Sequence, residues 1–208
     1  MVPLSTSDLN NPNTFPAFLN LPAEYEINDT YFSSTKPRKH WCFLGRVVSS
    51  SVMVRLTLQV EDKKGNRISI AFHTDDRGAS FQAQCTPGNT IAVLYATQHT
   101  FAFIPPGLRL EEATHVKVFP HTLEAMLKTS KAIFERDRTA RCEVCGRVDA
   151  NVKKCARCKT AWYCSKVTPS TYDTQPTRVI ILFHRRVRTT VGSLIKTSAP
   201  FSGTFSGL

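Results

Sequence analysis

Apolar and polar residues alternate over the middle of the chain, in short runs that are separated by turn residues. β-Branched and aromatic residues dominate these runs, and a period of two is the pattern of a strand with one buried face. The predicted strands are residues 43–49, 52–61, 67–73, 90–97 and 108–118. In the second strand we expect one buried face made of Val52, Val54, Leu56, Leu58 and Val60.

The connections between these runs predict how the strands are wired. The sequence DKKGN at 62–66 contains glycine and is typical of a hairpin turn, and the polar insert 74–89 is long enough for a short helix. Five strands in this order, with an insert between the third and fourth, resemble the OB-fold, a small Greek-key barrel. An SH3-like barrel and a small sandwich are the alternatives that the pattern leaves open.

Different patterns flank this region on either side. Residues 1–40 hold five of the twelve prolines and show no period, which indicates an irregular leader whose segment TFPAFLNLPAEY packs on the neighbouring domain. Residues 122–137 predict an amphipathic helix with Thr122 as its N-cap. Its apolar stripe is predicted to be Leu123, Met126, Leu127, Ile133 and Phe134.

Charge is distributed unevenly along the 208 residues, which carry a formal net charge of +11. Residues 121–208 hold 16 Lys and Arg against 6 Asp and Glu, whereas residues 41–120 hold 8 against 6. A nearly neutral barrel argues against nucleic-acid binding there, and basic residues near a cysteine cluster offset the charge of thiolates. We therefore treat nucleic acid as a possible partner that the charge pattern does not favour.

Cysteine usage and hydropathy bear on the compartment. No stretch reaches the roughly 18–20 apolar residues of a membrane span, and the N-terminus lacks a signal-peptide pattern. We therefore expect an intracellular protein with no membrane partner, in a compartment that the sequence does not narrow to nucleus or cytoplasm. There, Cys42 and Cys85 are expected to be ordinary buried residues, and clustered cysteines are expected to bind metal.

Five of the seven cysteines fall in one run, with the spacing Cys142-x2-Cys145-x9-Cys155-x2-Cys158-x5-Cys164. Two C-x-x-C pairs at this separation are ligand spacing for Zn²⁺, which takes four Cys or His ligands in a structural site. The predicted metal ligands are Cys142, Cys145, Cys155, Cys158 and Cys164. A chance cluster or a redox C-x-x-C pair is the less favoured alternative.

Together with KKCARCKTAWYCSK at 153–166, this spacing resembles the front half of a MYND-type zinc finger. The resemblance implies two interleaved zinc ions, with Cys142, Cys145 and Cys164 on the first and Cys155 with Cys158 on the second. It also implies a non-catalytic module that binds a protein partner, characteristically through short proline-containing peptides.

The sequence departs from the family pattern after Cys164. The family continues with a cysteine at position 168, then a histidine and a cysteine, whereas here position 168 is Thr168 and residues 165–208 hold no cysteine. We expect a finger cut off after its fifth cysteine that binds zinc weakly. The segment 167–208 is expected to be a disordered tail, either mis-spliced or part of a diverged finger that borrows His184 or Asp173.

The prediction is an α+β chain: an antiparallel OB-like barrel (41–120) after the leader (1–40), then a connecting helix (121–138), a partial MYND-type zinc finger (139–166) and the tail (167–208). The predicted function of the chain is zinc binding and protein interaction, with single-stranded nucleic-acid binding by the barrel as the alternative. We expect no enzyme, because no nucleophile, acid or base stands at a spacing that indicates catalysis, and because the chain has no room for the SET methyltransferase domain that some finger proteins carry.

Overall fold

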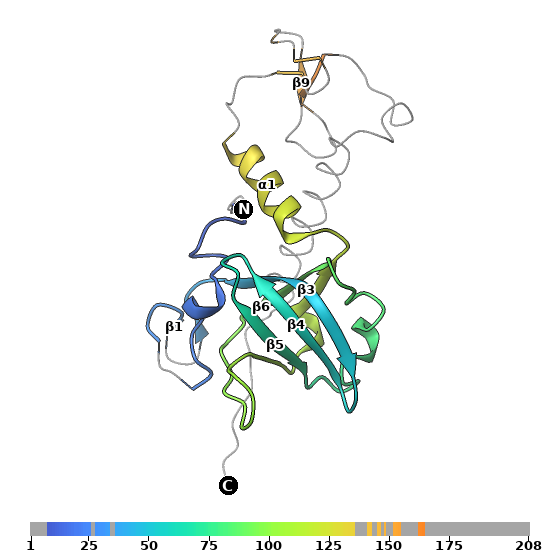
Figure 1. Ribbon diagram of the computed structural model, residues 1–208. Coiled ribbons are helices and arrows are strands. Elements are labelled where there is room, and N and C mark those ends of the chain that lie inside the picture. The colour runs from blue at the N-terminus through green and yellow to red at the C-terminus, as the bar shows by residue number, and fades with distance from the viewer. Residues whose placement is uncertain are drawn as a thin grey trace.

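The computed structural model describes residues 8–25, 28–33, 36–135, 141–142, 145–146, 148, 152–154 and 162–164. In this part the chain is rich in strands: six form one curled sheet, followed by a single α-helix, and the other four form two separate two-stranded sheets (Figure 1). The strands are β1 (Phe32–Ser33), β2 (Lys36–Pro37), β3 (Cys42–Val52), β4 (Leu56–Asp62), β5 (Arg67–Phe72), β6 (Thr90–Leu94), β7 (Leu108–Leu110), β8 (Val116–Phe119), β9 (Lys153–Lys154) and β10 (Trp162–Tyr163). The helices are α1 (Leu123–Phe134) and the short 3₁₀ turns η1 (Phe18–Asn20), η2 (Ala79–Phe81) and η3 (Ala113–His115).

The six-stranded sheet has the order β7-β5-β4-β3-β6-β8. Strands β5 and β7 are parallel, and every other neighbouring pair in this sheet is antiparallel. The two outermost strands, β7 and β8, are consecutive parts of one segment, residues 108–119. The four strands β5, β4, β3 and β6 therefore curl until this one segment pairs with both of their outer strands, β5 and β6. This is the wiring of an OB-like barrel.

This closing segment differs from the prediction of one strand over 108–118. The structure breaks it at η3, so that β7 pairs with β5 and β8 pairs with β6. A single straight strand cannot follow two neighbours that diverge around a barrel, and the 3₁₀ turn redirects the chain from one to the other.

The hairpin between β3 and β4 corrects a second prediction. Val52 ends β3 and pairs with Leu56, so the residues between them form the turn, and the predicted strand 52–61 begins four residues too early. Val52 and Val54 are 52% and 65% exposed, whereas Leu56 is 1% exposed. Leu56, Leu58 and Val60 share the buried face as predicted. The alternation of buried and less buried side chains begins only at Leu56, where the chain enters β4.

The barrel interior is filled by side chains from all its long strands, including the fully buried Phe43, Ile70 and Phe72. Two glycines allow close approach at its wall. A Cβ on Gly107 would lie 2.2 Å from the Ser69 carbonyl oxygen, and a Cβ on Gly78, whose φ is +84°, would lie 2.7 Å from the Leu56 Cβ. The insert 74–89, predicted to hold a short helix, contains η2 and packs Phe81 on Phe72.

The N-terminal segment has little regular structure, yet it packs on the barrel. Phe18 and Leu21 belong to the barrel core, which confirms the prediction that TFPAFLNLPAEY packs on the neighbouring domain, and Tyr31 further along the chain belongs to the same core. The Phe18 N–H donates to the Asp62 Oδ2 atom over 2.9 Å. Asp62, which is buried at the end of β4, thereby joins this segment to the β4–β5 turn.

Helix α1 confirms the predicted helix, with a shorter C-terminal end. Thr122 caps it by accepting a hydrogen bond from the Ala125 N–H, and the helix ends at Phe134 rather than Asp137. Leu123 and Met126 are buried in a second cluster that also contains Leu9 and Phe15 from the N-terminal segment. Phe134 is 40% exposed, so the predicted stripe does not run the full helix.

A polar contact on α1 was not predicted from the sequence. Ser130 is buried, accepts the Leu9 N–H over 2.9 Å and donates to the Asp8 carboxylate over 2.6 Å. In Figure 1 the blue N-terminal segment accordingly passes beside the yellow helix. None of the described helices is long and apolar enough to span a membrane.

Candidate metal centre

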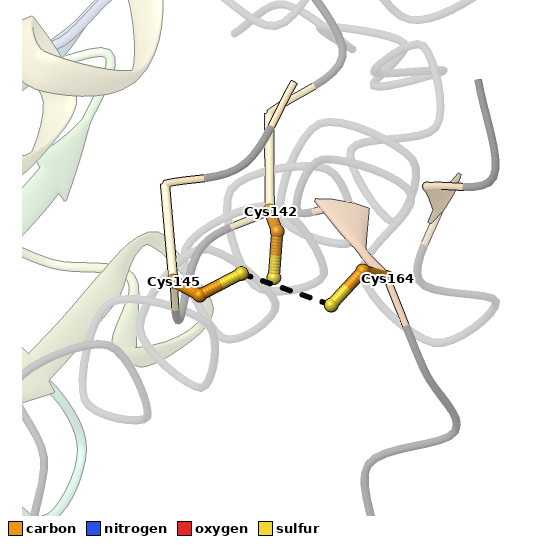
Figure 2. Close-up of side chains that lie close together, drawn as sticks. All are labelled: Cys142, Cys145 and Cys164. Carbon is orange, nitrogen blue, oxygen red and sulfur yellow. Dashed lines mark hydrogen bonds between the residues drawn. The ribbon is translucent and has the colours of Figure 1, made fainter. Parts of the chain in front are cut away.

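Three of the five predicted ligands come together in the structure. The sulfur atoms of Cys142, Cys145 and Cys164 all lie within 4.8 Å of one another, and Figure 2 shows the three side chains pointing toward a common centre. The Sγ atoms of Cys145 and Cys164 are 3.7 Å apart. Cys142 is buried, whereas Cys145 and Cys164 are exposed.

Short stretches of backbone pairing position these cysteines. Strand β10 pairs antiparallel with β9 and places Cys164 directly after its last residue. Cys142 forms a parallel bridge with Trp162 of β10, which brings the first C-x-x-C pair beside the strand. The Gly146 N–H donates to the Cys142 carbonyl over 2.9 Å with a φ of +70°, and glycine adopts this conformation without strain.

The geometry fits a tetrahedral metal ion. With Zn–S bonds of about 2.3 Å, two sulfurs at tetrahedral corners lie about 3.8 Å apart, close to the separation of the Cys145 and Cys164 sulfurs. A disulfide needs about 2.05 Å between its sulfurs, and none of the three cysteines is disulfide-bonded. Hydrogen bonds with Cys142 and Cys145, and repulsion from their charges, raise the pKa of Cys164. A bound cation would relieve this repulsion and favour the thiolates.

The other predicted ligands lie outside the described residues. These are Cys155 and Cys158, together with the candidate replacements His184 and Asp173, and the proposed tail 167–208 lies there too. Their roles stay predictions. Among the residues that the structure does describe, the metal-ligating group consists of three cysteines.

Residues around the cluster give it limited apolar support. Trp162 and Tyr163 are half-buried and supply apolar bulk to a module without a large core. Val152 is buried beside β9 and was not singled out in the sequence, because one valine in a charged stretch has no periodic pattern. Lys153 is exposed, and its backbone pairs with Tyr163, the residue before Cys164.

The two remaining cysteines confirm their predicted place in the barrel. Cys42 and Cys85 are buried and free. Burial raises the pKa of the Cys42 thiol to about 12 and that of Cys85 to about 11. Both thiols therefore stay protonated near neutral pH and are poor metal ligands.

The barrel offers a second candidate surface on the outer face of β4, β5 and β7. Its floor is polar, with the Gln59 side chain donating to the Ser69 hydroxyl over 2.7 Å. Burial lowers the pKa of the nearby His73, as do the positive charges of Arg55 and Arg109. Arg109 forms an ion pair with Glu111 over 2.7 Å.

An aromatic ring stands at the edge of this polar face. Phe101 lies close to Gly107, because a Cβ added to this glycine would be 3.1 Å from the Phe101 ring. The Phe101 ring also packs edge-on against the His99 ring, with 4.6 Å between the two ring centroids. The Phe101 side chain is half-buried. A polar floor with arginines and one aromatic edge could hold an anionic strand.

Comparison with known proteins gives one match at the level of a family and several distant matches to solved structures. The family model of the MYND finger matches residues 142–168. No curated protein matches the chain. Among solved structures, a chain of a replication protein A heterotrimer bound to ssDNA has 14% identity and a TM-score of 0.33, covering 55% of this chain and 82% of that chain.

Two further structures have similar scores. Schizosaccharomyces pombe Pot1pC bound to ssDNA has 10% identity and a TM-score of 0.34, covering 50% of this chain and 96% of that chain. A chain of the S. pombe Stn1-ten1 complex has 14% identity and a TM-score of 0.30, covering 51% and 88%. At such low scores, the OB-like wiring rests on the strand pairings alone. The chain thus carries a MYND-type finger sequence at residues 142–168, after an OB-like barrel.

Proposed function

We propose that this chain is a non-catalytic, zinc-binding interaction protein whose MYND-type finger docks a protein partner. The observation that carries the proposal is the convergence of the Cys142, Cys145 and Cys164 sulfurs. These residues come from two segments, and β10 and the Gly146 turn place them together. Thiolates are soft ligands that select zinc among the common structural ions.

The ligand count sets the expected affinity. A closed structural site has four ligands and supplies roughly 10–16 kcal/mol in small finger peptides. Here the chain offers three described thiols for the first ion, and the family's cysteine at 168 is replaced by Thr168. We therefore propose that zinc binds more weakly than in a complete finger.

Metal titration of the full chain tests this proposal. Co²⁺ should give sulfur-to-metal charge-transfer absorption, and Zn²⁺ should displace it, with stoichiometry followed by native mass spectrometry. Cys145→Ser should weaken binding at least about tenfold, because it removes one thiolate ligand. Cys85→Ser is the matched control in the barrel and should leave binding unchanged. Absence of any metal binding would overturn the function, and two tightly held zinc ions would overturn the predicted weakness.

Adding a ligand gives the complementary test. Thr168→Cys should raise the affinity for zinc. In the cobalt-loaded chain it should increase the charge-transfer absorption per Co²⁺ ion by about one third, because three thiolates become four. Thr171→Cys places the same new thiol out of register and should not. Equal affinity of the two variants would contradict the idea that position 168 limits the site.

The partner proposed from the family resemblance is a protein segment that contains proline. Fluorescently labelled proline-containing peptides should bind the zinc-loaded chain more tightly than sequence-matched peptides in which alanine replaces proline. The preference should disappear in the variant in which Cys142, Cys145 and Cys164 are all serine. A preference that survives in this variant would place peptide binding elsewhere in the chain.

A second candidate function is binding of single-stranded nucleic acid by the barrel. Arg55, Arg109 and Phe101 around the polar face of β4, β5 and β7 favour it, and the nearly neutral charge of residues 41–120 counts against it. Gel shifts with single-stranded oligonucleotides at low salt decide the question. Arg55→Ala with Arg109→Ala should weaken any binding, whereas Lys128→Ala on α1 should not. No shift at low salt removes this candidate.

A further inference from the structure

We propose that a hydroperoxide oxidises Cys145 and Cys164 to a disulfide, and that this bond and the metal ion exclude each other. The second half rests on the proposed zinc binding, because only an ion held by these thiols can be displaced. The first half concerns the chain's thiols alone. The site is thus an oxidation site as well as a metal site.

The geometry of the two sulfurs favours this bond. Their Sγ atoms are 3.7 Å apart. A disulfide at about 2.05 Å requires them to approach by less than about 2 Å. Cys145 lies in a turn and Cys164 follows the last residue of β10, so neither is held inside a strand. Both side chains are exposed, which gives a small oxidant direct access.

Burial distinguishes the third cysteine of the cluster. Cys142 is buried, and its backbone is bridged to Trp162. A peroxide therefore reaches Cys145 and Cys164 more easily than it reaches Cys142. We infer that Cys142 is the thiol that stays reduced.

The reaction balances with the peroxide as the oxidant. A thiolate sulfur of the exposed pair attacks one oxygen of hydrogen peroxide, the O–O bond breaks, and the sulfur becomes a sulfenic acid, while the departing hydroxide takes up the proton that the thiol released on ionisation and leaves as water. The sulfur of the second thiol then attacks the sulfenic sulfur, the S–O bond breaks, and a second water leaves with the thiol proton. Two electrons pass from the two sulfurs to the peroxide, and a thiol reductant reverses the bond by exchange.

Metal binding competes with this step. A disulfide sulfur is no longer a thiolate ligand, so oxidation removes two of the three described ligand atoms. Conversely, a bound ion uses the electron pairs with which the sulfurs would attack the peroxide. Zinc should slow disulfide formation, and disulfide formation should release the ion.

The experiment treats the full chain, metal-free and zinc-loaded, with hydrogen peroxide. Remaining thiols are alkylated, and the linked peptides are mapped by mass spectrometry without reduction. We expect a peptide pair joined through Cys145 and Cys164, and zinc release that a colorimetric chelator follows in step with it. Cys42 and Cys85 serve as internal controls and should become alkylated only after the barrel unfolds, because both are buried.

Serine variants assign the bond. Cys145→Ser and Cys164→Ser should each abolish the linked peptide, whereas Cys142→Ser and the barrel control Cys85→Ser should preserve it. A bond through Cys142, a bond between Cys155 and Cys158 in place of the proposed one, or no disulfide in the metal-free chain would overturn the inference. Zinc binding without the disulfide would leave the proposed function intact, and the disulfide without zinc binding would overturn that function alone.

Discussion

The barrel and the described residues of the finger differ in how much apolar surface they bury. The barrel buries large side chains such as Phe43, Ile70 and Phe72 completely, and its closing segment pairs with both ends of the sheet. Among the described residues of the finger, only Cys142 and Val152 are buried. The barrel is therefore stabilised mainly by apolar burial, whereas under the proposed function the finger needs an ion to hold its segments together.

This contrast teaches where each region is vulnerable. Removing a buried side chain should unfold the barrel and leave the thiol cluster chemically intact. Changing a thiol should remove the ion and leave the barrel folded. The following predictions test whether the two regions are as separate as this contrast requires.

The largest effect is expected for Phe72→Ala in the barrel. It should lower the free energy of unfolding by about 3–5 kcal/mol, because it removes a fully buried ring and leaves a cavity. Urea unfolding followed by circular dichroism measures this loss, and Phe103→Ala is the control, since Phe103 is almost fully exposed. A comparable loss in both variants would show that the core is elsewhere.

Asp62→Ala should give the next largest loss, about 2–3 kcal/mol, because it leaves buried donors without an acceptor. The Asp62 carboxylate accepts hydrogen bonds from the backbone N–H groups of Phe18, Lys64 and Asn66. Unfolding by urea at pH 7 measures the effect. Glu111→Ala, on an exposed acidic residue, should cost little by comparison.

The same carboxylate predicts how barrel stability depends on pH. Burial alone would raise the pKa of Asp62, but hydrogen bonds from Asn66, Phe18 and Lys64 outweigh it and lower the pKa below the usual 3.8. Because the folded pKa is the lower one, its contribution is present above about pH 4 and is lost as the pH falls through the folded pKa. Asp62→Asn should therefore flatten the acid limb of the stability profile, and an unchanged limb would contradict this assignment.

Ser130→Ala should cost about 1–2 kcal/mol, because Asp8 and the Leu9 N–H lose a hydrogen-bond partner. Hydrogen exchange should show faster opening of the N-terminal segment and α1, with the amides of β3 and β4 little changed. Thr129→Ala, one position away, is the matched control. If the whole barrel opened faster, the segment would be part of one cooperative unit with the sheet.

The smallest effect is expected for Cys145→Ser on the barrel. Its unfolding free energy should change by less than about 0.5 kcal/mol, because the substituted side chain is exposed and makes no described contact with the barrel core. Chemical unfolding with and without zinc measures this. A larger change would show that the ion stabilises the barrel and that the two regions are coupled.

Much of the barrel could be predicted because apolar and polar residues alternate along a strand that has one buried face. Leu56, Leu58 and Val60 alternate with polar residues, and the structure buries all three. Alternation misled at Val52 and Val54, because a hairpin turn can carry apolar residues without burying them. The break at η3 could not be predicted, because the divergence of two neighbouring strands is a property of the closed sheet.

The candidate metal ligands could be named from the sequence for a different reason, the spacing of the cysteines along the chain. Ligand spacing is local, so the spacing indicated five cysteines, the family resemblance implied that Cys142, Cys145 and Cys164 share one ion, and the structure brings these three sulfurs together. The Asp8–Ser130 contact joins residues 122 positions apart, and no local pattern marks such a pair. The solvent exposure of the three cysteines could not be predicted either, because nothing in the spacing distinguishes the buried Cys142 from the exposed Cys145 and Cys164.

The joining of β7 and β8 through η3 also has a consequence for how the chain folds during synthesis. Strands β3 to β6 can pair as soon as they leave the ribosome, but both edges of that four-stranded sheet stay open until residues 108–119 have emerged. Open edges invite pairing with other chains. A nascent chain that stalls before residue 119 should therefore be the species most prone to aggregate.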